Sequence, residues 1–377
     1  MAYIRPVRVD EVEAVNDFLS KNGLIMPAPG AAAARFWEGR WVRNPTLSQH
    51  DPSVVHGWVL EDAGRMVGFF GNLPMAGVFG AEPVRIACAS AWAVEPAYRD
   101  WVEKLCDCYF HQPNIDLLLV TSAIKPTARR FAQFDGCAVP QPDLGEILYW
   151  VVEAQGFLRA AFRKKGRGGG MAWLLGLLGS VPLDFSVRLK GRRPYGSLDN
   201  LSLVSLSGID AAFDDLWARR RVQLPTTLLA NRDAATLRWH FGLGGTHDQT
   251  RVLRYDEDGV LKGYVVLVRE DAPDIGLKRL KIADMFVDSD DAHVAQALFA
   301  GAYDFATLKK CHVLEVVGLA VPLRAQALKS KPMTRAMATF PFYYKVPPGA
   351  AIESLGTELM QPDAWYMTAY DGDTVLL

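Results

Sequence analysis

Two acidic residues stand in or directly after apolar runs, where a carboxylate can serve as a base. Glu95 follows the run "IACASAWAV", and Asp284 lies inside "KIADMFV". Apolar surroundings disfavour the charged form of a carboxylate, which suits it to taking up a proton near neutral pH. Structural roles are the alternative, with Glu95 a solvated strand end and Asp284 holding a neighbouring loop by hydrogen bonds. Both residues are therefore candidate catalytic bases.

A helix expected to begin near Asp233 carries the polar and aromatic residues of "LRWHF". Successive helical residues point about 100° apart, so Arg238, Trp239 and His240 cannot share one face. We carry His240 as a candidate catalytic residue and the other two as candidate substrate contacts. The alternative is that Trp239 packs in the core and His240 is a structural hydrogen-bond donor.

A third group of acidic residues lies near the C-terminus, in "DGD". Asp371 and Asp373 flank Gly372, directly after an apolar alternation at Trp365, Met367 and Ala369. The two carboxylates could bind the hydroxyls of a sugar or an amine, and a plain turn explains the pattern equally well. Both are candidate substrate contacts.

The stretch "SAWAVEPAYRDWVEKL" reads as a strand that runs directly into a helix, with Pro96 in the first helical turn. Backbone amides at a helix start carry partial positive charge and attract anions. Arg99 could pair with a phosphate there, whereas Asp100 and Trp101 narrow and discourage entry. The turn is either an anion site or only a corner of the fold.

The whole chain has 377 residues, which exceeds one ordinary core and favours two domains. Its 41 basic and 42 acidic residues leave a formal charge of -1, so no overall field attracts DNA or an anionic membrane. The five cysteines show no zinc-ligand spacing and fit reduced thiols. The charged N-terminus resembles no secretion signal. We expect a cytoplasmic protein without a metal site.

The elements needed to position these residues occur twice in the same order. Each half reads as helix, hairpin, strand, helix, buried strand, helix and strand. The hairpins turn at Asp62-Ala63-Gly64 and at Asp258-Gly259, and the buried strands lie at Leu117 and Val313. Two copies of one α+β unit are the simplest account.

A basic, glycine-rich segment around the apolar run "MAWLLGLLGSVPL" separates the two copies. The run is too short to cross a bilayer, which takes about 20 apolar residues. It is either a linker helix that packs on one domain or a peripheral membrane contact. The basic residues that would meet anionic lipid are Arg159, Arg163, Lys164, Lys165, Arg167, Arg192 and Arg193.

The order of elements resembles the Gcn5-related N-acetyltransferase fold, and "VEPAYRD" resembles the start of that family's coenzyme A motif. The segments "NRDAATLRWHF" and "DAWYMTAYDGD" are similar to parts of acetyltransferase-like proteins from bacterial polysaccharide gene clusters. The resemblance implies an α+β protein with two tandem domains, each a mixed central sheet flanked by helices. The implied limits are 1–155 for the first domain, 156–200 for the linker and 201–377 for the second domain.

The resemblance also implies acetyl-CoA or another acyl-CoA as the acyl donor, without a metal. In the family, amides of a glycine-rich turn hold the pyrophosphate. Here no glycine follows Arg99, and the second turn, "VDSDDAHVAQ", carries three carboxylates that would repel phosphate. The residues that the resemblance assigns to the donor are Ala93, Val94, Arg99, Asp100, Trp101 and Val102.

The sequence also lacks the tyrosine that often protonates the leaving thiolate in this family. Phe131 in the first half and Leu328 in the second half occupy the places where it is expected. Tyr343 or Tyr344 could project toward the cleft, and Trp92 with Tyr343 are further candidate substrate contacts.

Three functions remain open from the sequence. The first is an acyltransferase that moves an acyl group from coenzyme A to an amine or hydroxyl of a small molecule, for example a sugar. The second uses aminoacyl-tRNA as donor, against which the near-neutral charge counts. The third is a noncatalytic binding or scaffold protein, which the altered phosphate turns favour.

Overall fold

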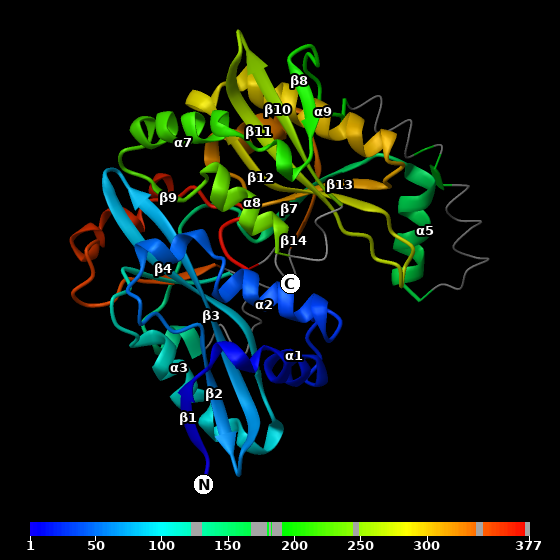
Figure 1. Cartoon of the computed structure of the whole chain (residues 1–377). Helices are drawn as coiled ribbons and strands as arrows, with labels where there is room; N and C mark the ends of the chain where they lie inside the picture. Colours follow the sequence, from blue (N-terminus) through cyan, green and yellow to red (C-terminus); the bar gives the residue numbers. More distant parts are fainter. Residues whose placement is uncertain are drawn as a thin grey trace.

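Two mixed β-sheets with flanking helices make up the protein in the computed structural model (Figure 1). The structure describes residues 1–121, 130–166, 179–180, 182, 191–243, 249–336 and 342–373. The first sheet lies mainly in the blue and cyan half of Figure 1 and the second in the green, yellow and orange half. The expected α+β class is confirmed.

Sheet A has the strand order β1-β2-β3-β4-β5-β15-β6, and β9 pairs with β3 beside this path. Neighbouring strands are antiparallel except β4 and β5, which are parallel. Its strands are β1 Tyr3–Pro6, β2 Gly57–Asp62, β3 Arg65–Phe79, β4 Glu82–Val94, β5 Leu117–Val120, β6 Cys137–Ala138, β9 Leu228–Ala230 and β15 Tyr343–Lys345.

Sheet B has the order β14-β7-β13-β12-β11-β10-β8, and again one central pair, β12 with β13, is parallel. The equivalent order and the two confirmed hairpins support two copies of one unit. Its strands are β7 Glu146–Val151, β8 Leu201–Val204, β10 Thr250–Glu257, β11 Val260–Arg269, β12 Arg279–Val287, β13 Val313–Val317 and β14 Met333–Ala336.

The last long strand of each copy lies in the sheet of the other copy. The sequence order led us to expect β7 to close the first sheet and β15 to close the second, and this was wrong. β7 pairs with β13 and β14, whereas β15 pairs with β5 and β6. Both sheets offer an apolar strand edge of the same kind, so sequence order cannot tell which edge receives which strand. The predicted domain limits stay a prediction.

The helices cover both faces of the sheets. α1 and α2 pack on one face of sheet A in a cluster with Val59, Phe69 and Ala91. α3 packs on the opposite face, against Phe70 and Ala87. The helices are α1 Val12–Lys21, α2 Ala31–Trp41, α3 Val102–Phe110, α5 Ala154–Lys164, α7 Ala211–Gln223, α8 Ala234–Gly242, α9 Ala292–Leu308 and α10 Val321–Lys329.

One apolar core is shared by the two halves. It joins Leu73 and Ile86 of sheet A to Val265 and Leu298 of the second half. The segment 364–373 is buried in this region, both at the apolar positions noted in the sequence and at the positions between them. A single bridge to Leu228 links it to a strand. The two halves therefore form a continuous interior.

The structure describes the basic linker at residues 156–166, 179–180, 182 and 191–200. α5 holds its beginning, whereas most of the apolar run and Arg167 lie outside the described residues. Within the described ranges, no helix has the length and hydropathy needed to cross a bilayer. The membrane contact stays a prediction.

Candidate active site

The two central parallel strands of sheet A part from each other after a short stretch. In the described chain, β4 pairs with β5 only from Ile86 to Cys88. Just beyond, Ala91 is an extra residue between the pairs Phe70–Trp92 and Gly71–Ser90, with a φ of 50°. Such a bulge bends a strand and re-aims its side chains. We call the place where the strands part the notch, lined by Cys88, Ser90, Ala91 and Thr121.

Arg40 reaches the notch from α2. Its Nη2 donates to the Ser90 hydroxyl at 2.5 Å, and Ala91 packs against the same helix, so the bulge turns both residues toward α2. Burial lowers the pKa of Arg40 to about 10, while the negative charge of Asp373 acts in the opposite direction. Arg40 therefore remains a cation at neutral pH.

Asp373, in the buried C-terminal segment, contacts Thr121 of the notch. The Thr121 hydroxyl donates to its Oδ1 at 3.1 Å, and the Asp373 amide lies 3.3 Å from the same hydroxyl oxygen. Gly372 has a φ of 138°, and a Cβ there would lie 2.1 Å from Thr121 Oγ1. The "DGD" pattern thus allows the chain to approach β5 closely.

Cys88 is the thiol of the notch. Burial raises its pKa, followed by the effect of the Asp373 charge. A thiol is a poor nucleophile compared with a thiolate. The arrangement therefore does not favour a covalent acyl-cysteine.

The turn after β4 is a short 3-10 helix, η3 (Pro96–Trp101), that continues into α3. Two amides at this turn are engaged, since the Tyr98 amide donates to the Glu95 carbonyl and the Val102 amide donates to the Arg99 carbonyl. Arg99 and Asp100 are exposed. Lys104 Nζ lies 4.1 Å from the centre of the Trp101 ring. This turn can offer a phosphate cationic side chains, but few free amides.

The remaining residues assigned to the donor lie at the end of β4. Ala93 and Val94 pair with Phe69 and Gly68 of β3. They connect the notch to η3 along one strand.

Glu95 lies between β4 and η3 and is ion-paired. Arg65 Nη1 lies 2.5 Å from its Oε1, and the Glu95 side chain is about one quarter exposed. It lies beyond Val94 on the strand, away from the notch. Its catalytic role stays a prediction.

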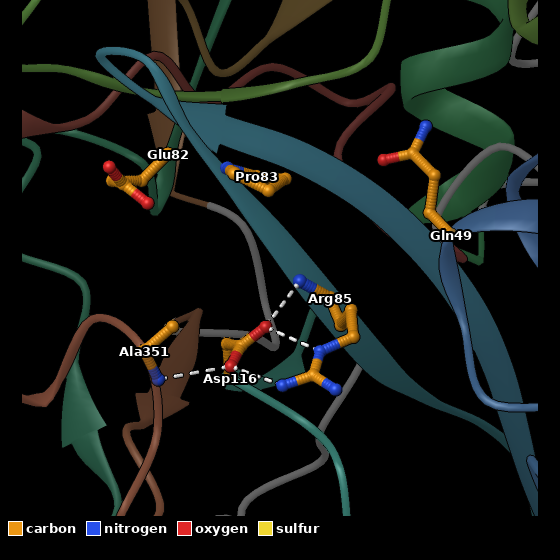
Figure 2. A pocket seen from close by; sticks show the side chains of 6 residues that line it. All are labelled: Gln49, Glu82, Pro83, Arg85, Asp116 and Ala351. Atoms are coloured by element: carbon orange, nitrogen blue, oxygen red, sulfur yellow. Dashed lines mark hydrogen bonds and ion pairs between the residues drawn. The ribbon is translucent and has the colours of Figure 1, made fainter.

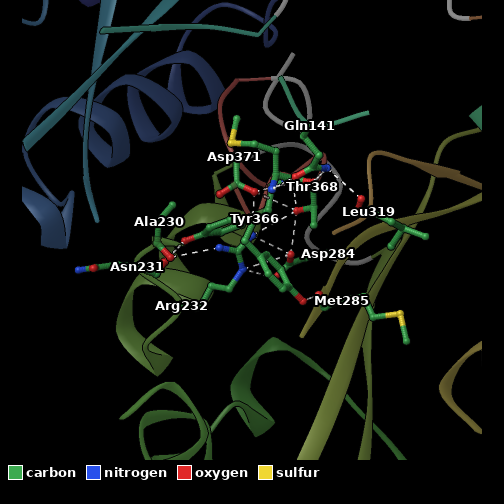
Figure 3. Close-up of polar contacts among 12 residues, drawn as sticks. Gln141, Ala230, Asn231, Arg232, Asp284, Met285, Leu319, Tyr366, Thr368 and Asp371 are labelled. Atoms are coloured by element: carbon green, nitrogen blue, oxygen red, sulfur yellow. Dashed lines mark hydrogen bonds and ion pairs between the residues drawn. The ribbon is translucent and has the colours of Figure 1, made fainter. Parts of the chain in front are cut away.

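Asp284 belongs to a buried polar cluster of the second unit (Figure 3). Its carboxylate accepts hydrogen bonds from Arg232, from Tyr264 Oη at 2.9 Å and from Thr368 Oγ1 at 2.8 Å. Arg232 Nη2 also donates to Asp371 at 2.8 Å. Burial raises the pKa of Asp371, and Arg232 counteracts this. Asp284 and Asp371 therefore anchor the C-terminal segment to the second unit.

In the second unit, the equivalent turn lies between β12 and α9 and carries three carboxylates, each of which has a hydrogen-bond or ion-pair partner. Asp288 accepts from Arg219, and Asp290 pairs with Arg220 at 2.8 Å. Asp291 caps α9 by accepting from the amides of residues 293 and 294. Because a side-chain carboxylate already holds the amides at this helix start, a pyrophosphate would have to displace it.

The residues of "LRWHF" lie on α8, which contacts both the first unit and the rest of the second unit. Trp239 Nε1 donates to the Gly39 carbonyl of α2 at 2.7 Å, and Arg238 donates to the Ile209 carbonyl. His240 is buried, and neither ring nitrogen has a hydrogen-bond partner among the residues that the structure describes. Its ring centre lies 4.4 Å from that of Tyr370. Their roles at a site stay predictions.

Trp92 and Tyr343 lie on the α3 side of sheet A. The Trp92 ring lies 5.1 Å from Phe70, and the Tyr343 ring lies 6.4 Å from Phe131. Both belong to the cluster under α3, on the face opposite to Arg40. The structure thus brings Asp373 to the notch and leaves these two on the other side of the sheet.

A separate cavity of about 340 Å³ opens at the other end of β4 (Figure 2). Among its lining residues, Arg85 and Asp116 form an ion pair at 2.8 Å, and the Ala351 amide also donates to Asp116. Glu82, Pro83 and Gln49 also line the cavity. The cavity lies at the beginning of β4, whereas the notch lies in the later half of this strand. The two are therefore different sites.

Sequence reasoning missed Arg40, Ser90 and Thr121. It did not anticipate α2, although a signal was present. Ala33, Phe36, Trp37 and Trp41 follow helical spacing, and Arg40 falls inside that buried stripe. A cation on an apolar helix face is the pattern that could have been noticed.

The paired sheets, each with one parallel central pair, define the tandem Gcn5-related N-acetyltransferase fold. Solved structures with this fold cover nearly the whole chain. A GCN5-related N-acetyltransferase from Anabaena variabilis matches with a TM-score of 0.58 and 14% identity, over 92% of this chain and 73% of that chain. No protein-family model matches the sequence, and no curated protein does.

Two further solved structures are similar. One is a conserved protein of unknown function from Enterococcus faecalis, described as a probable N-acyltransferase, with a TM-score of 0.57, 10% identity and coverage of 92% of this chain and 72% of its own. The other is Eis1 from Mycobacterium abscessus, with a TM-score of 0.52, 11% identity and coverage of 95% and 76%. At these identities the likeness establishes the fold alone.

Proposed function

We propose that the protein transfers an acyl group from a coenzyme A thioester to an amine or hydroxyl, with the donor bound in the first unit. The observation that carries this proposal is the notch. There β4 leaves β5, a bulge turns Ser90 and Ala91 toward α2, and the cation Arg40 lies within electrostatic reach of the carboxylate Asp373. Polar groups of both signs gathered in a buried place suit a reaction in which charge develops on a carbonyl.

The donor would extend along the end of β4. Its acyl end would occupy the notch, and its phosphates would lie near η3, where Arg99 is exposed and Lys104 covers Trp101. We assign the acceptor to Asp373, whose carboxylate can hold an ammonium or hydroxyl group of a small molecule.

The second unit supports the fold of the first and does not bind the donor. Its turn is closed by Asp291, and Asp284 is held by Arg232. In this proposal only the first unit binds the donor. The second unit has instead a cluster in which Arg232 pairs with the carboxylates of Asp284 and Asp371.

The test is thermal unfolding with coenzyme A, acetyl-CoA and longer acyl thioesters. A ligand at about 100 times its dissociation constant stabilises by about 2.7 kcal/mol. We expect Arg99→Gln with Lys104→Gln to reduce the shift, because both cations lie at the first turn. Lys262→Gln is the matched control, since Lys262 lies 3.8 Å from Asp288 at the second turn.

A noncatalytic role is the second candidate, favoured by the engaged amides of η3. If no thioester raises the unfolding temperature of the unmodified protein, the noncatalytic role is preferred. If salt-sensitive tRNA binding occurs instead, an aminoacyl-tRNA donor takes its place.

A further inference from the structure

Arg40 has one hydrogen-bonding group that no described residue uses. The residue is 2% exposed, and its Nη2 donates to Ser90. Its Nη1 is buried and has no hydrogen-bond partner within the described part of the chain. Leaving a buried donor unpaired is costly, and more so for a charged group. Arg40 is therefore a buried cation whose Nη1 group is available to donate a hydrogen bond to a ligand.

The surroundings explain how Arg40 is held. Its guanidinium lies 5.0 Å from the Phe36 ring centre and 5.7 Å from that of Trp37. Aromatic faces attract a cation and restrict its movement. Together with the Ser90 hydrogen bond, these rings fix the guanidinium beside the bulge of β4.

The charges near Arg40 select the kind of group that it can bind. Asp373 interacts electrostatically with Arg40, so the two formal charges cancel. A permanent anion such as a phosphate would gain little there, because the carboxylate repels it. A neutral carbonyl oxygen is not repelled as strongly, and it gains from the donor more as it becomes negative.

We propose that Arg40 Nη1 donates a hydrogen bond to the carbonyl oxygen of the acyl thioester and stabilises its negative charge during transfer. This proposal rests on the proposed function. When the acceptor nitrogen bonds to the carbonyl carbon, the C=O electron pair moves to the oxygen beside Arg40. As the pair returns, the C–S bond breaks, and the proton of the attacking amine ends on the departing thiolate, directly or through water.

The experiment compares the affinities of three ligands for the intact protein by calorimetry. They are coenzyme A, acetyl-CoA and S-ethyl-coenzyme A, in which an ethyl group replaces the acetyl group and the carbonyl oxygen is absent. We expect acetyl-CoA to bind about ten- to a hundredfold more tightly than S-ethyl-coenzyme A, as a charge-assisted hydrogen bond allows. This comparison requires no variant and is unaffected by misfolding.

Arg40→Met removes the donor and keeps the length of the side chain. We expect the variant to lose the preference for acetyl-CoA while its affinity for coenzyme A stays within about twofold, since the hydrogen bond concerns only the acyl oxygen. Arg43→Met is the matched control, because it removes an exposed cation three residues further along the chain and leaves Arg40 with its Ser90 hydrogen bond in place. It is expected to keep most of the preference.

The outcomes separate this proposal from the one on which it rests. If the unmodified protein binds none of the three ligands, the donor site itself is refuted. If acetyl-CoA and S-ethyl-coenzyme A bind equally well, the donor site stands and the role of Arg40 is refuted. A preference that survives in Arg40→Met also refutes it.

Discussion

His240 shows at the scale of one residue how burial sets the charge of a side chain. Its ring is buried against Tyr370 and Phe241, and the charged groups that face it are Arg40 and Arg232. Burial, with repulsion from both arginines, lowers the pKa of His240 to about 3. The ring is therefore neutral in the folded protein at neutral pH.

We expect His240 to make the free energy of unfolding decrease as the pH decreases. The unfolded chain binds the proton near pH 6.5 and the folded chain near pH 3, so stability is complete above 6.5 and is lost as the pH drops toward 3. The loss is about 2 kcal/mol between pH 6.5 and 5. Urea unfolding at several pH values measures it. The pKa of His56 is lowered to about 4, also mainly by burial, and acts in the same direction.

The variant His240→Phe identifies the source of this pH dependence. It should flatten the plot of unfolding free energy against pH by the amount that His240 contributes. His111→Phe is the control, since the ring of His111 is exposed and meets water in both states. An unchanged slope in His240→Phe would mean that the buried ring is not the cause.

Asp284 and Arg232 show why a buried carboxylate need not be a base. The apolar neighbours of Asp284 indicated burial, and the carboxylate is buried. Its oxygens, however, accept from Arg232, Tyr264 and Thr368. Those partners come from distant parts of the chain, so the sequence around Asp284 carries no sign of them.

At the scale of elements, the exchanged strands tie each sheet to the other half of the chain. β7 lies early in the sequence, yet Trp150 on this strand packs against Phe299 of α9 and donates to Ser330. A substitution in the first half should therefore damage the second sheet.

The variant Trp150→Ala is expected to lower the free energy of unfolding by about 3–5 kcal/mol, as removal of a large buried aromatic side chain does. Hydrogen exchange would show which strands are affected. We expect the amides of β13 and β14 to lose more protection than those of β2, because both strands pair with β7. Trp101→Ala, also in the first half but in η3, is the control and should spare β13. Equal loss in β2 and β13 would contradict this expectation.

For the whole molecule, the shared core and the exchanged strands predict that neither half folds alone. Fragment 1–155 lacks β9 and β15, so β5 has an open edge, and fragment 201–377 lacks β7, so β13 and β14 lose their common partner. Each fragment alone is expected to show no cooperative unfolding transition by circular dichroism. Produced together, the two should copurify and unfold in one transition. A cooperative transition in either isolated fragment would refute the prediction.

The control for the fragments is the full chain cut after it has folded. A protease site placed in the linker between residues 166 and 191 breaks the chain without removing either exchanged strand. The two pieces should stay together, because the core that joins them is buried.

The sequence by itself determined the local elements and their repeated order. The hairpin turns at Gly64 and Gly259 and the helix start near Asp233 depend on neighbouring residues, and all three formed as predicted. Tertiary structure decided which sheet receives β7 and β15, and which polar side chains meet at the notch. Arg40 and Asp373 are more than three hundred residues apart in sequence. Their meeting depends on packing between distant segments, which no local pattern encodes.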